Sequence, residues 1–501
     1  MSKLVHTGVV VIGTGFSGMG MAIQLRKQGR EDFVVLEKAK DFGGTWRDNS
    51  YPGCACDIQS HMYSFSFEPK ADWSRAFAPQ PEIYEYMRGV AAKWDLARNT
   101  VFGAEVAGAR WDEEENRWYV ATTTGDTYVA QYLISGIGAL HLPQVPHLNG
   151  IENFQGKAFH SARWDHDYDL AGKRVAVIGT GASAIQFVPR IAKDVARLTL
   201  FQRTPPWVMP KPDHAMPEWS KSAFAKVPGA FRGYRHFLYW LNEVRAVGFN
   251  GNLGVLKAAS RLAAWNIKRS VRDPELVAKL TPDYVMGCKR VLISNDYYPT
   301  FRRDNVALDT SGVAEVKANS IVTNDGQEIE VDAIIYGTGF QVIDAMQHLD
   351  VVGRDGVQLG KLWQENGVNT YNGINVAGFP NLFFLLGPNT GLGHNSVVFM
   401  IEAQLNYIRE AMKLAERHNV EAIDVRPGAQ EQFNIEIQRK LREGVWTQGG
   451  CKSWYLDAQG VNRTLWPGFT WKYWLKTRKV DGSDFELITR SRSPQPAGAT
   501  T

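Results

Sequence analysis

Residues 8–18 read Gly8-Val-Val-Val-Ile-Gly-Thr-Gly-Phe-Ser-Gly18, an apolar run that leads directly into a glycine-rich turn. A continuous apolar run is typical of a buried parallel strand. The glycines at 13, 15 and 18 permit a tight turn, a close approach of the backbone to a pyrophosphate, and close packing of the following helix, expected over residues 19–28. A second strand, expected over residues 33–36, ends at Glu37, 24 positions after Gly13. A carboxylate there can accept hydrogen bonds from ribose hydroxyls, so the stretch predicts a dinucleotide-binding unit.

The second half of the chain repeats this plan. Residues 173–178 form another apolar run, Gly179-Thr-Gly-Ala-Ser-Ala184 supplies the turn, and a helix is expected from 183 to 192. Arg203 lies 24 positions after Gly179, the same offset as that of Glu37 in the first half. An acid at this place suits a free ribose hydroxyl, whereas an arginine suits a 2′-phosphate. The first site is therefore predicted to bind FAD or NAD, and the second NADP.

Each half also contains a hairpin and a closing strand. Gly125-Asp126 and Asp325-Gly326 are turn dipeptides between strand-like segments, and the apolar segments 132–138 and 331–339 both close on a Gly-x-Gly turn. The recurrence indicates an internal duplication. We predict an α/β fold with two Rossmann-like dinucleotide-binding domains, duplicated as in the disulfide reductases, and a helical insertion.

The expected domain boundaries follow from the repeats. The FAD-binding domain is discontinuous, 1–148 and 378–490, and so is the NADP-binding domain, 149–208 and 286–377. Between them, 209–285 is the helical insertion, whose aromatic side chains are interpreted as cover for the core rather than as a membrane anchor. A strand and turn over 378–391 and a long helix from about Val397 to Arg417 should return the chain to the first domain. Residues 491–501 are rich in Pro, Ala, Ser and Thr and are predicted to be a disordered tail.

Composition excludes several classes of function. The formal net charge is +4 over 501 residues, without a long run of Lys or Arg, which gives nucleic acid or an acidic membrane little to bind. No apolar run of about 18 residues is present, so no integral membrane segment is expected. Four cysteines are too few for a disulfide scaffold of this size and favour a reducing compartment. We expect a cytoplasmic monomer or homodimer, and no metal, because the histidines lack ligand spacing.

Two longer motifs identify a family. Phe154, Gly156, His160, Trp164 and Asp165 fit Phe-x-Gly-x-x-x-His-x-x-x-Trp followed by Pro or Asp. A Gly-x-Trp pattern followed by Tyr-Pro-Gly-x-x-x-Asp is met by residues 44–57. On these motifs the chain resembles the class B flavoprotein monooxygenases, and among them the type I Baeyer–Villiger monooxygenases. The resemblance runs from about Val9 to Gly468.

The resemblance implies a reaction. It implies an FAD-containing, NADPH-dependent monooxygenase that inserts one oxygen atom of O2 next to a ketone carbonyl through a peroxyflavin and yields an ester or lactone. The family's catalytic arginine matches Arg290, and its active-site aspartate, which orients that arginine, matches Asp57. The tryptophan of its mobile C-terminal loop matches Trp454, although the Gly-x-Asn expected just after it falls late, at 460–462. His160 matches a hinge residue in the linker.

Residue types and resemblance together give a set of expected cofactor contacts. They are Gly13, Gly15, Phe16, Ser17, Gly18, Glu37, Gly44, Thr45, Trp46, Asp57, Tyr63, Val106, Gly179, Thr180, Gly181, Ser183, Gln186, Arg203, Thr204, Lys289, Arg290 and Trp454.

Other interpretations stay open at this stage. From the residues alone, Asp57 could be a turn residue and Lys289-Arg290 a pair of solvated surface cations. An N- or S-oxygenating flavin monooxygenase would use the same fold. An FAD/NADPH disulfide reductase would need a paired dithiol, for which Cys54-Ala-Cys56 is spaced too closely. A non-catalytic NADPH sensor is the third alternative.

Overall fold

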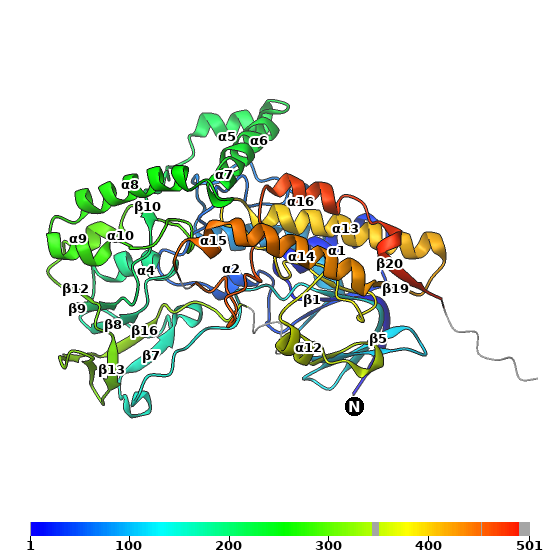
Figure 1. Cartoon of the computed structure of the whole chain (residues 1–501), viewed down its shortest axis with the longest axis horizontal. Helices are drawn as coiled ribbons and strands as arrows, with labels where there is room; N and C mark the ends of the chain where they lie inside the picture. Colours follow the sequence, from blue (N-terminus) through cyan, green and yellow to red (C-terminus); the bar gives the residue numbers. More distant parts are fainter. Residues whose placement is uncertain (1, 343–349, 452, 490–501) are drawn as a thin grey trace, which may run out of the picture.

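The computed structural model describes residues 2–342, 350–451 and 453–489. In this part of the chain the largest element is an eight-stranded sheet with the order β17-β4-β5-β6-β1-β2-β3, to which β18 adds by pairing with β6 (Figure 1). Its strands are β1 (Leu4–Ile12), β2 (Phe33–Glu37), β3 (Thr100–Phe102), β4 (Val106–Asp112), β5 (Arg117–Thr122), β6 (Thr127–Ser135), β17 (Asp350–Val352) and β18 (Leu382–Phe384).

The first glycine turn connects the centre of this sheet to a helix. β1 pairs in parallel with both β2 and β6, and Val9, Val10 and Val11 are completely buried, as the apolar run predicts. α1 (Phe16–Lys27) starts inside the turn. A Cβ added to Gly18 would lie 1.8 Å from the carbonyl oxygen of Gly13, so only glycine lets the helix approach the strand this closely. The long helix expected near 397–417 is α13 (Val397–His418), which packs against α1.

A second, five-stranded parallel sheet has the order β12-β9-β8-β16-β7. Together the two sheets confirm the predicted duplicated α/β fold. The strands are β7 (Lys157–His160), β8 (Arg174–Ile178), β9 (Arg197–Phe201), β12 (Val306–Asp309) and β16 (Ala333–Tyr336), and α4 (Ala184–Ile191) follows the second glycine turn.

Both predicted hairpins are present, but they are used differently. β5 and β6 pair around Gly125-Asp126 within the large sheet, and residues 127–135 form one continuous strand. The second hairpin, β14 (Ser320–Thr323) and β15 (Glu328–Glu330), joins β13 (Val313–Val316) in a separate three-stranded sheet.

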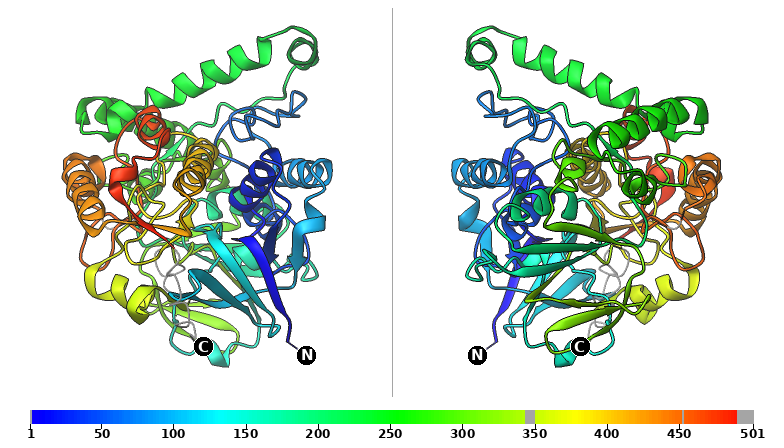
Figure 2. Two further views of the ribbon diagram at one scale, coloured as in Figure 1. Left: turned by 90° about the vertical axis from the view of Figure 1, so that its right-hand side faces the viewer. Right: turned by 90° about the vertical axis from the view of Figure 1, so that its left-hand side faces the viewer.

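Helices extend from the second sheet where the insertion is expected. Strands β10 (Val208–Met209) and β11 (Leu292–Ile293), which precede and follow the inserted helices in the sequence, pair in parallel. Figures 1 and 2 show α5 and α6 projecting from the body of the molecule. The helices are α5 (Glu218–Lys226), α6 (Ala230–Glu243), α7 (Ala246–Phe249), α8 (Leu253–Ser270) and α9 (Pro274–Leu280).

The remaining elements cover the two sheets and connect them. β17 already pairs with β4 of the first sheet, although Asp350 precedes the boundary expected at 378; the domain boundaries remain predictions. The predicted tail, 491–501, lies outside the described residues. The further elements are α2 (Thr45–Asp48), α3 (Gln80–Lys93), α10 (Tyr297–Thr300), α12 (Leu359–Asn366), α14 (Pro427–Glu443), α15 (Val445–Gln448), α16 (Thr470–Thr477), β19 (Ala422–Val425), β20 (Phe485–Ile488) and the short 3-10 helices η1 (Leu96–Asn99), η2 (Ile151–Asn153), η3 (Ser161–Arg163), η4 (Arg354–Gly356) and η5 (Gly482–Asp484).

The cysteines differ from the expectation of reduced thiols. Cys288 and Cys451 form a disulfide between segments 163 residues apart, so that expectation is wrong for this pair. The reason is that the fold brings two distant loops together, which the cysteine count does not reveal. Cys54 and Cys56 are unpaired and buried. No helix in the described ranges is both long enough and apolar enough to cross a bilayer.

Candidate active site

Glycines of two turns form the wall of a cavity of about 280 Å³ at the carboxyl end of β1. Gly13 has φ +93°, and a Cβ there would lie 2.8 Å from the carbonyl oxygen of Gly136. A Cβ on Gly44 would lie 2.9 Å from Cα of Gly15. Side chains are thus excluded where the two backbones meet, which fits close approach of a pyrophosphate. Of the expected cofactor contacts, the cavity is lined by Gly13, Gly15, Phe16, Ser17, Glu37, Gly44, Thr45, Trp46, Tyr63 and Val106.

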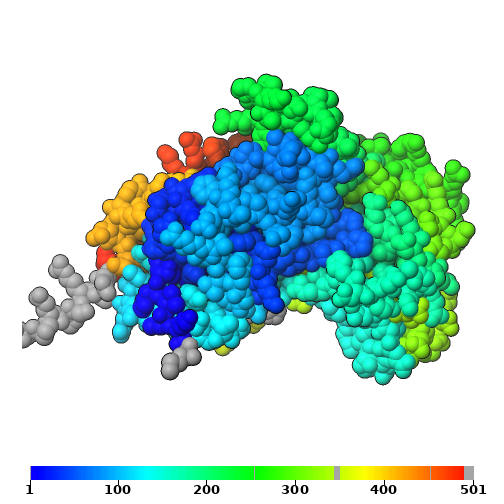
Figure 3. Space-filling view, turned by 180° about the vertical axis from the view of Figure 1, so that it is seen from behind, coloured from blue at the N-terminus to red at the C-terminus, as the bar shows by residue number. Residues whose placement is uncertain are grey.

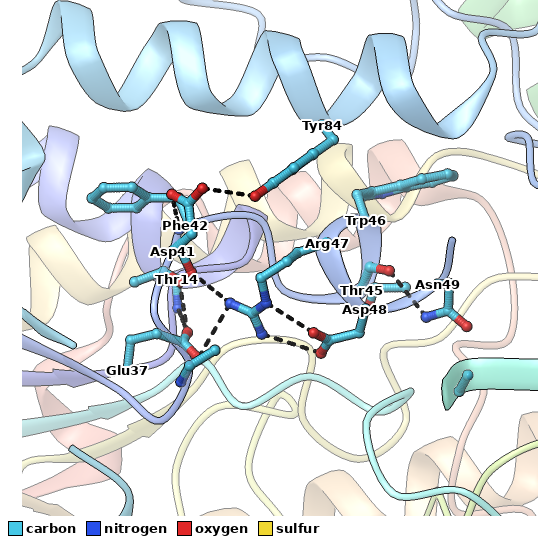
Figure 4. A network of polar contacts seen from close by, with 12 residues as sticks. Thr14, Glu37, Asp41, Phe42, Thr45, Trp46, Arg47, Asp48, Asn49 and Tyr84 are labelled. Carbon is cyan, nitrogen blue, oxygen red and sulfur yellow. Dashed lines mark hydrogen bonds and ion pairs between the residues drawn. The ribbon is translucent and has the colours of Figure 1, made fainter. Parts of the chain in front are cut away.

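Glu37 is fixed at the edge of this cavity (Figure 4). Its Oε2 accepts hydrogen bonds from the backbone nitrogen and the hydroxyl of Thr14, at 2.9 and 2.6 Å, and its Oε1 accepts one from the nitrogen of Ala39 at 2.9 Å. Arg47 Nη1 lies 3.3 Å from Oε1. The carboxylate is therefore held in one orientation. Oε2 already accepts two hydrogen bonds, whereas Oε1 accepts one and retains lone-pair capacity for a ribose hydroxyl.

Sequence reasoning missed several lining residues. Arg47 donates to Asp48 and to the backbone oxygen of Asp41, and Tyr84 donates to the Asp41 carboxylate, which makes the network drawn in Figure 4. The signal that could have found Arg47 is its place directly after Trp46 in the Gly-x-Trp motif. The missed lining residues with polar side chains are Thr14, Lys38, Arg47, Asp48, Glu105 and His141.

Trp46 and Tyr63 form the wall that leads from the cavity to the predicted catalytic residues. Trp46 Nε1 donates to the Tyr63 hydroxyl at 3.2 Å, and Phe16 meets the Tyr63 ring edge-on. Burial, reinforced by Cys56 and Asp57, raises the pKa of Tyr63 far above its usual value. The hydroxyl therefore stays protonated and can donate a hydrogen bond.

Asp57 and Arg290 form an ion pair next to this wall. Arg290 donates from Nε and Nη2 to the same oxygen of Asp57, at 3.2 and 2.6 Å. Burial opposes ionisation of Asp57, but the charge of Arg290 outweighs it and the pKa of Asp57 is lowered. The charge of Asp57 in turn raises the pKa of Arg290. Within the described part of the chain, Nη1 of Arg290 has no hydrogen-bond partner, so the guanidinium keeps donors for an incoming oxygen.

Two residues that the sequence analysis missed complete this cluster. Lys211 places its Nζ 3.2 Å from the backbone oxygen of Cys56, and its charge also lowers the pKa of Asp57. Burial raises the pKa of Tyr455 to about 12, although the charge of Arg290 opposes the shift. Trp454, the expected loop tryptophan, is 45% exposed and packs on Tyr455 with ring centroids 4.4 Å apart. The buried residue of this segment that interacts with Arg290 is therefore Tyr455.

The second glycine turn is built like the first. Gly179 has φ +101°, and a Cβ there would lie 2.7 Å from the carbonyl oxygen of Gly337. The Thr180 hydroxyl donates to the backbone oxygen of Thr204 at 3.3 Å, which fixes the turn beside the end of β9. Gly181 and Ser183 precede α4 in the same turn.

Arg203 and Lys289 meet beside this turn from different parts of the sequence. Arg203 is exposed, and burial together with the charge of Arg203 lowers the pKa of Lys289. Lys289 Nζ lies over the ring of Tyr284, 5.1 Å from its centroid. The charge of Asp283 partly opposes this lowering of the pKa of Lys289. Two cations close together suit a phosphate.

Gln186 connects the two halves of the molecule. Its Oε1 accepts from the Tyr51 hydroxyl at 3.0 Å, and its Nε2 donates to the backbone oxygen of Ala55 at 3.0 Å. The fingerprint residues lie at the same junction, where Trp164 packs on Phe187 of α4. His160 is buried, which lowers its pKa to about 4, and its Nδ1 accepts from the nitrogen of Ala162. His160 is therefore neutral and structural in this arrangement.

The thiols near Asp57 do not suit a disulfide reductase. Burial raises the pKa of Cys54 to about 12 and that of Cys56 further. Because the thiolate is the reactive form, neither cysteine is a nucleophile near neutral pH.

Comparisons with known proteins agree with this geometry. Residues 10–228 match the family model described as pyridine nucleotide-disulphide oxidoreductase. The chain is 51% identical over 485 residues to a Baeyer-Villiger monooxygenase of Pseudomonas aeruginosa, covering 97% of this chain and 92% of the relative. It is 46% identical over 493 residues to a Baeyer-Villiger monooxygenase of Streptomyces coelicolor, covering 98% and 94%.

Solved structures of similar proteins share the fold over the full length. A cyclohexanone monooxygenase from Rhodococcus sp. Phi1 bound to NADP+ superposes with a TM-score of 0.87 at 30% identity, covering 97% of this chain and 100% of that one. A steroid monooxygenase bound to NADP superposes with a TM-score of 0.87 at 29% identity and the same coverage. With two relatives at or near half identity along almost its whole length, the chain belongs to the Baeyer–Villiger monooxygenase family.

Proposed function

We propose that the protein is an FAD-containing, NADPH-dependent monooxygenase that inserts one oxygen atom of O2 next to a ketone carbonyl and releases an ester or lactone. The observation that carries this proposal is the Asp57–Arg290 ion pair beside Tyr63, which itself lines the glycine-walled cavity. It puts a permanent cation next to the expected dinucleotide, where oxygen chemistry would take place.

The residues around the cavity fit FAD. Glycine backbones leave room for the pyrophosphate, Glu37 offers Oε1 to the ribose, and the aromatic pair Trp46 and Tyr63 lines the same cavity. When bound and reduced by NADPH, FAD would supply the activated oxygen. The protein supplies position, charge and exclusion of water.

Arg290 is proposed to stabilise the negative charge that develops on oxygen when the ketone carbonyl is attacked. A guanidinium stays charged at every working pH and costs no reorganisation if it is already oriented. Asp57 provides that orientation through the two hydrogen bonds to one of its oxygens. Asp57 is therefore a positioning residue, and Arg290 is the catalytic one.

The coenzyme is proposed to be NADPH because Arg203 and Lys289 lie together beside the second glycine turn. The 2′-phosphate is the group that distinguishes NADPH from NADH, and it requires such cations. Thr180, Gly181 and Thr204 would hold the pyrophosphate and ribose nearby.

The substrate class is proposed from relatives. The similar solved structures include several of cyclohexanone monooxygenases, one of which is bound to ε-caprolactone, and one of a steroid monooxygenase. A cyclic ketone is accordingly the first class to test here. We also propose that the protein acts in the cytoplasm, where NADPH is supplied, as a monomer or homodimer.

Product analysis tests the proposal. Purified protein reconstituted with FAD would be given NADPH, O2 and a panel of cyclic, aryl and linear ketones, with thioanisole and a tertiary amine alongside. We expect one ester or lactone per NADPH, carrying one ¹⁸O atom when ¹⁸O2 is used. Oxidation of the sulfide or amine without any ester would instead favour the N- or S-oxygenating alternative. Failure to bind FAD would reject the whole proposal.

A further inference from the structure

The positive charge of the protein is concentrated in its helical insertion. The insertion, residues 209–285, contains twelve Lys and Arg and six Asp and Glu, and its central part, 219–272, contains ten of these cations and a single carboxylate, Glu243, whereas the whole chain carries a net charge of only +4. The rest of the protein is therefore net acidic. No contiguous run of cations reveals this asymmetry, because the basic residues are distributed over three helices. A strongly basic segment on a nearly neutral protein indicates an anionic partner.

Helix α6 carries large apolar side chains on its solvent side as well as on its buried side. Its solvent side carries Phe237, Trp240, Leu241 and, just after the helix, Val244, which are 59%, 54%, 45% and 66% exposed. Their spacing of three and four residues puts them in one stripe. Phe237 stacks on Tyr234 and Trp240 meets Tyr239 edge-on, both within α6, and these contacts leave the stripe largely exposed.

The buried side of the same helix combines the apolar Leu238 and Tyr239 with polar side chains. Asn242 donates to the side chain of Gln59 at 2.9 Å, and Glu243 accepts from Asn395 at 2.7 Å and from the Thr470 hydroxyl at 2.9 Å. These hydrogen bonds fix the rotation of the helix, so the aromatic stripe cannot turn inward. The exposure of this apolar face is thus fixed by the fold of the insertion.

Neighbouring helices have the same combination of aromatic and basic side chains. Trp219 of α5 is 75% exposed, and Trp265 of α8 is 52% exposed with the Arg269 guanidinium over its ring. Trp474 of α16 is 40% exposed. In Figure 1, α5, α6, α8 and α16 all lie along the upper edge of the molecule, and Figure 3 shows the α5–α6 lobe standing out beyond the body from behind.

We propose that this edge is a docking surface for an anionic lipid bilayer. Tryptophan and phenylalanine insert at the boundary between headgroups and acyl chains, and lysine and arginine contact anionic headgroups. A second copy of the chain would have to tolerate like charge across the contact, and nucleic acid would not require an aliphatic stripe of leucine and valine. A lipid surface is the partner that uses both properties. The interaction is peripheral and needs no spanning segment.

Vesicle sedimentation of the FAD-loaded full chain tests this proposal. We expect binding to vesicles of equal parts phosphatidylglycerol and phosphatidylcholine, and at least about tenfold weaker binding to phosphatidylcholine alone. Raising the salt to about 1 M, where the Debye length falls to about 3 Å, should release most of the protein.

Two variants separate the contributions. Trp219→Ser, Phe237→Ser and Trp240→Ser together should abolish insertion, measured as loss of sedimentation. Lys257→Glu, Arg261→Glu and Lys268→Glu together should weaken binding by about 100-fold or more, since each cation near an anionic surface contributes about fivefold. Ile435→Ser on α14, where the isoleucine is 62% exposed, and Arg417→Glu at the end of α13 are the matched controls and should bind like the wild type.

FAD content and NADPH oxidation without vesicles show whether each variant is folded, and both should equal those of the wild type. Equal binding to neutral and anionic vesicles would overturn the proposal, as would unaltered binding of both triple variants. A concentration-dependent dimer abolished by the serine variant would show that a second copy covers the face. Tighter binding to an oligonucleotide than to the vesicles would identify nucleic acid as the partner instead.

Discussion

Arg290 and Asp57 lie 233 residues apart in the sequence, yet Arg290 donates two hydrogen bonds to one oxygen of Asp57. Nε and Nη2 are used in this contact, so the guanidinium plane is fixed from one side. Lys211 approaches the same carboxylate from another segment. The cluster therefore presents an oriented cation to the cavity wall at Tyr63, and its parts can be tested separately.

Replacing Arg290 with alanine should separate coenzyme oxidation from oxygen insertion. By analogy with loss of one oxyanion-stabilising donor, we expect ester formation to fall by about 100- to 1000-fold. Hydride transfer from NADPH builds no such anion, so NADPH oxidation should continue and release hydrogen peroxide. The measurement is ester and peroxide formed per NADPH. Arg290→Lys keeps the charge but not the fork of donors, so its yield of ester per NADPH should lie between those of the wild type and of Arg290→Ala. If Arg290→Ala forms as much ester per NADPH as the wild type, a residue other than Arg290 supplies the catalytic cation.

Asp57→Ala should produce a milder form of the same uncoupling, because it removes the orientation of Arg290 but not its charge. Asp57→Asn keeps one acceptor oxygen and should recover part of the coupling. The pKa of Asp57 is lowered by Arg290, so the carboxylate is ionised throughout the working range. Coupling in the wild type should accordingly show no titration attributable to Asp57 between pH 5 and 9, roughly, when ester yield is measured against pH. An inflection that disappears in Asp57→Asn would contradict this.

Arg203→Ala should change the choice of coenzyme. A charge-assisted hydrogen bond to the 2′-phosphate contributes about 1.5–3 kcal/mol, which corresponds to roughly 10- to 150-fold in affinity. We expect KM for NADPH to rise by about this factor, while KM for NADH changes little. Arg197→Ala, at the exposed start of β9, is the control for loss of a nearby surface charge. Equal losses for both coenzymes would assign Arg203 a structural role.

His61 should make the stability of the protein sensitive to acid. Burial, assisted by the charges of Arg235 and Lys70, lowers its pKa from 6.5 to about 4, and its ring packs against Phe224, Phe231 and Tyr234 of the insertion. Because the folded pKa lies below the unfolded one, this stabilisation is complete above pH 6.5 and is lost as the pH falls toward 4.

The loss can reach about 3 kcal/mol in the free energy of unfolding. His61→Phe keeps an aromatic ring but cannot titrate, so its unfolding free energy should depend less on pH in this window. The same substitution at exposed His418 is the control. Denaturant titrations at several pH values measure the effect, and an unchanged pH dependence in His61→Phe would reject it.

The Cys288–Cys451 disulfide should stabilise the segment that carries Arg290. It closes a loop of 163 residues and joins that segment to the one that carries Tyr455. Removing such a crosslink typically lowers the free energy of unfolding by about 2–4 kcal/mol. We expect a reducing agent to lower Tm of the wild type. The Cys288→Ala, Cys451→Ala double variant should have the Tm of the reduced wild type, whether or not the reducing agent is present. A wild type indifferent to reduction would contradict the prediction.

The nucleotide-binding framework was predictable because its requirements are local. Gly13, Gly18 and Gly179 occupy positions where backbone conformation or contact excludes a side chain, and the apolar runs before the turns must be buried strands. The long helix α13 could be placed within one residue at its end for the same reason, since its apolar period is continuous. The roles of the second hairpin and of β17 were not predictable, because strand pairing depends on partners far away in the sequence.

By itself the sequence determined the duplicated fold, the two glycine turns, and the residue types that match Asp57 and Arg290. Only the tertiary structure decided that these two pair with each other, that Lys211 and Tyr455 join them, and that Cys288 bonds to Cys451. It also decided that Phe237 and Trp240 of α6 face solvent, whereas Tyr239 of the same helix is buried, as the expectation that these rings cover the core requires. The physical reason is the same in each case: these contacts join loops and helices more than a hundred residues apart, or depend on how a helix is rotated by polar partners on another element. No local pattern of residues encodes such an arrangement.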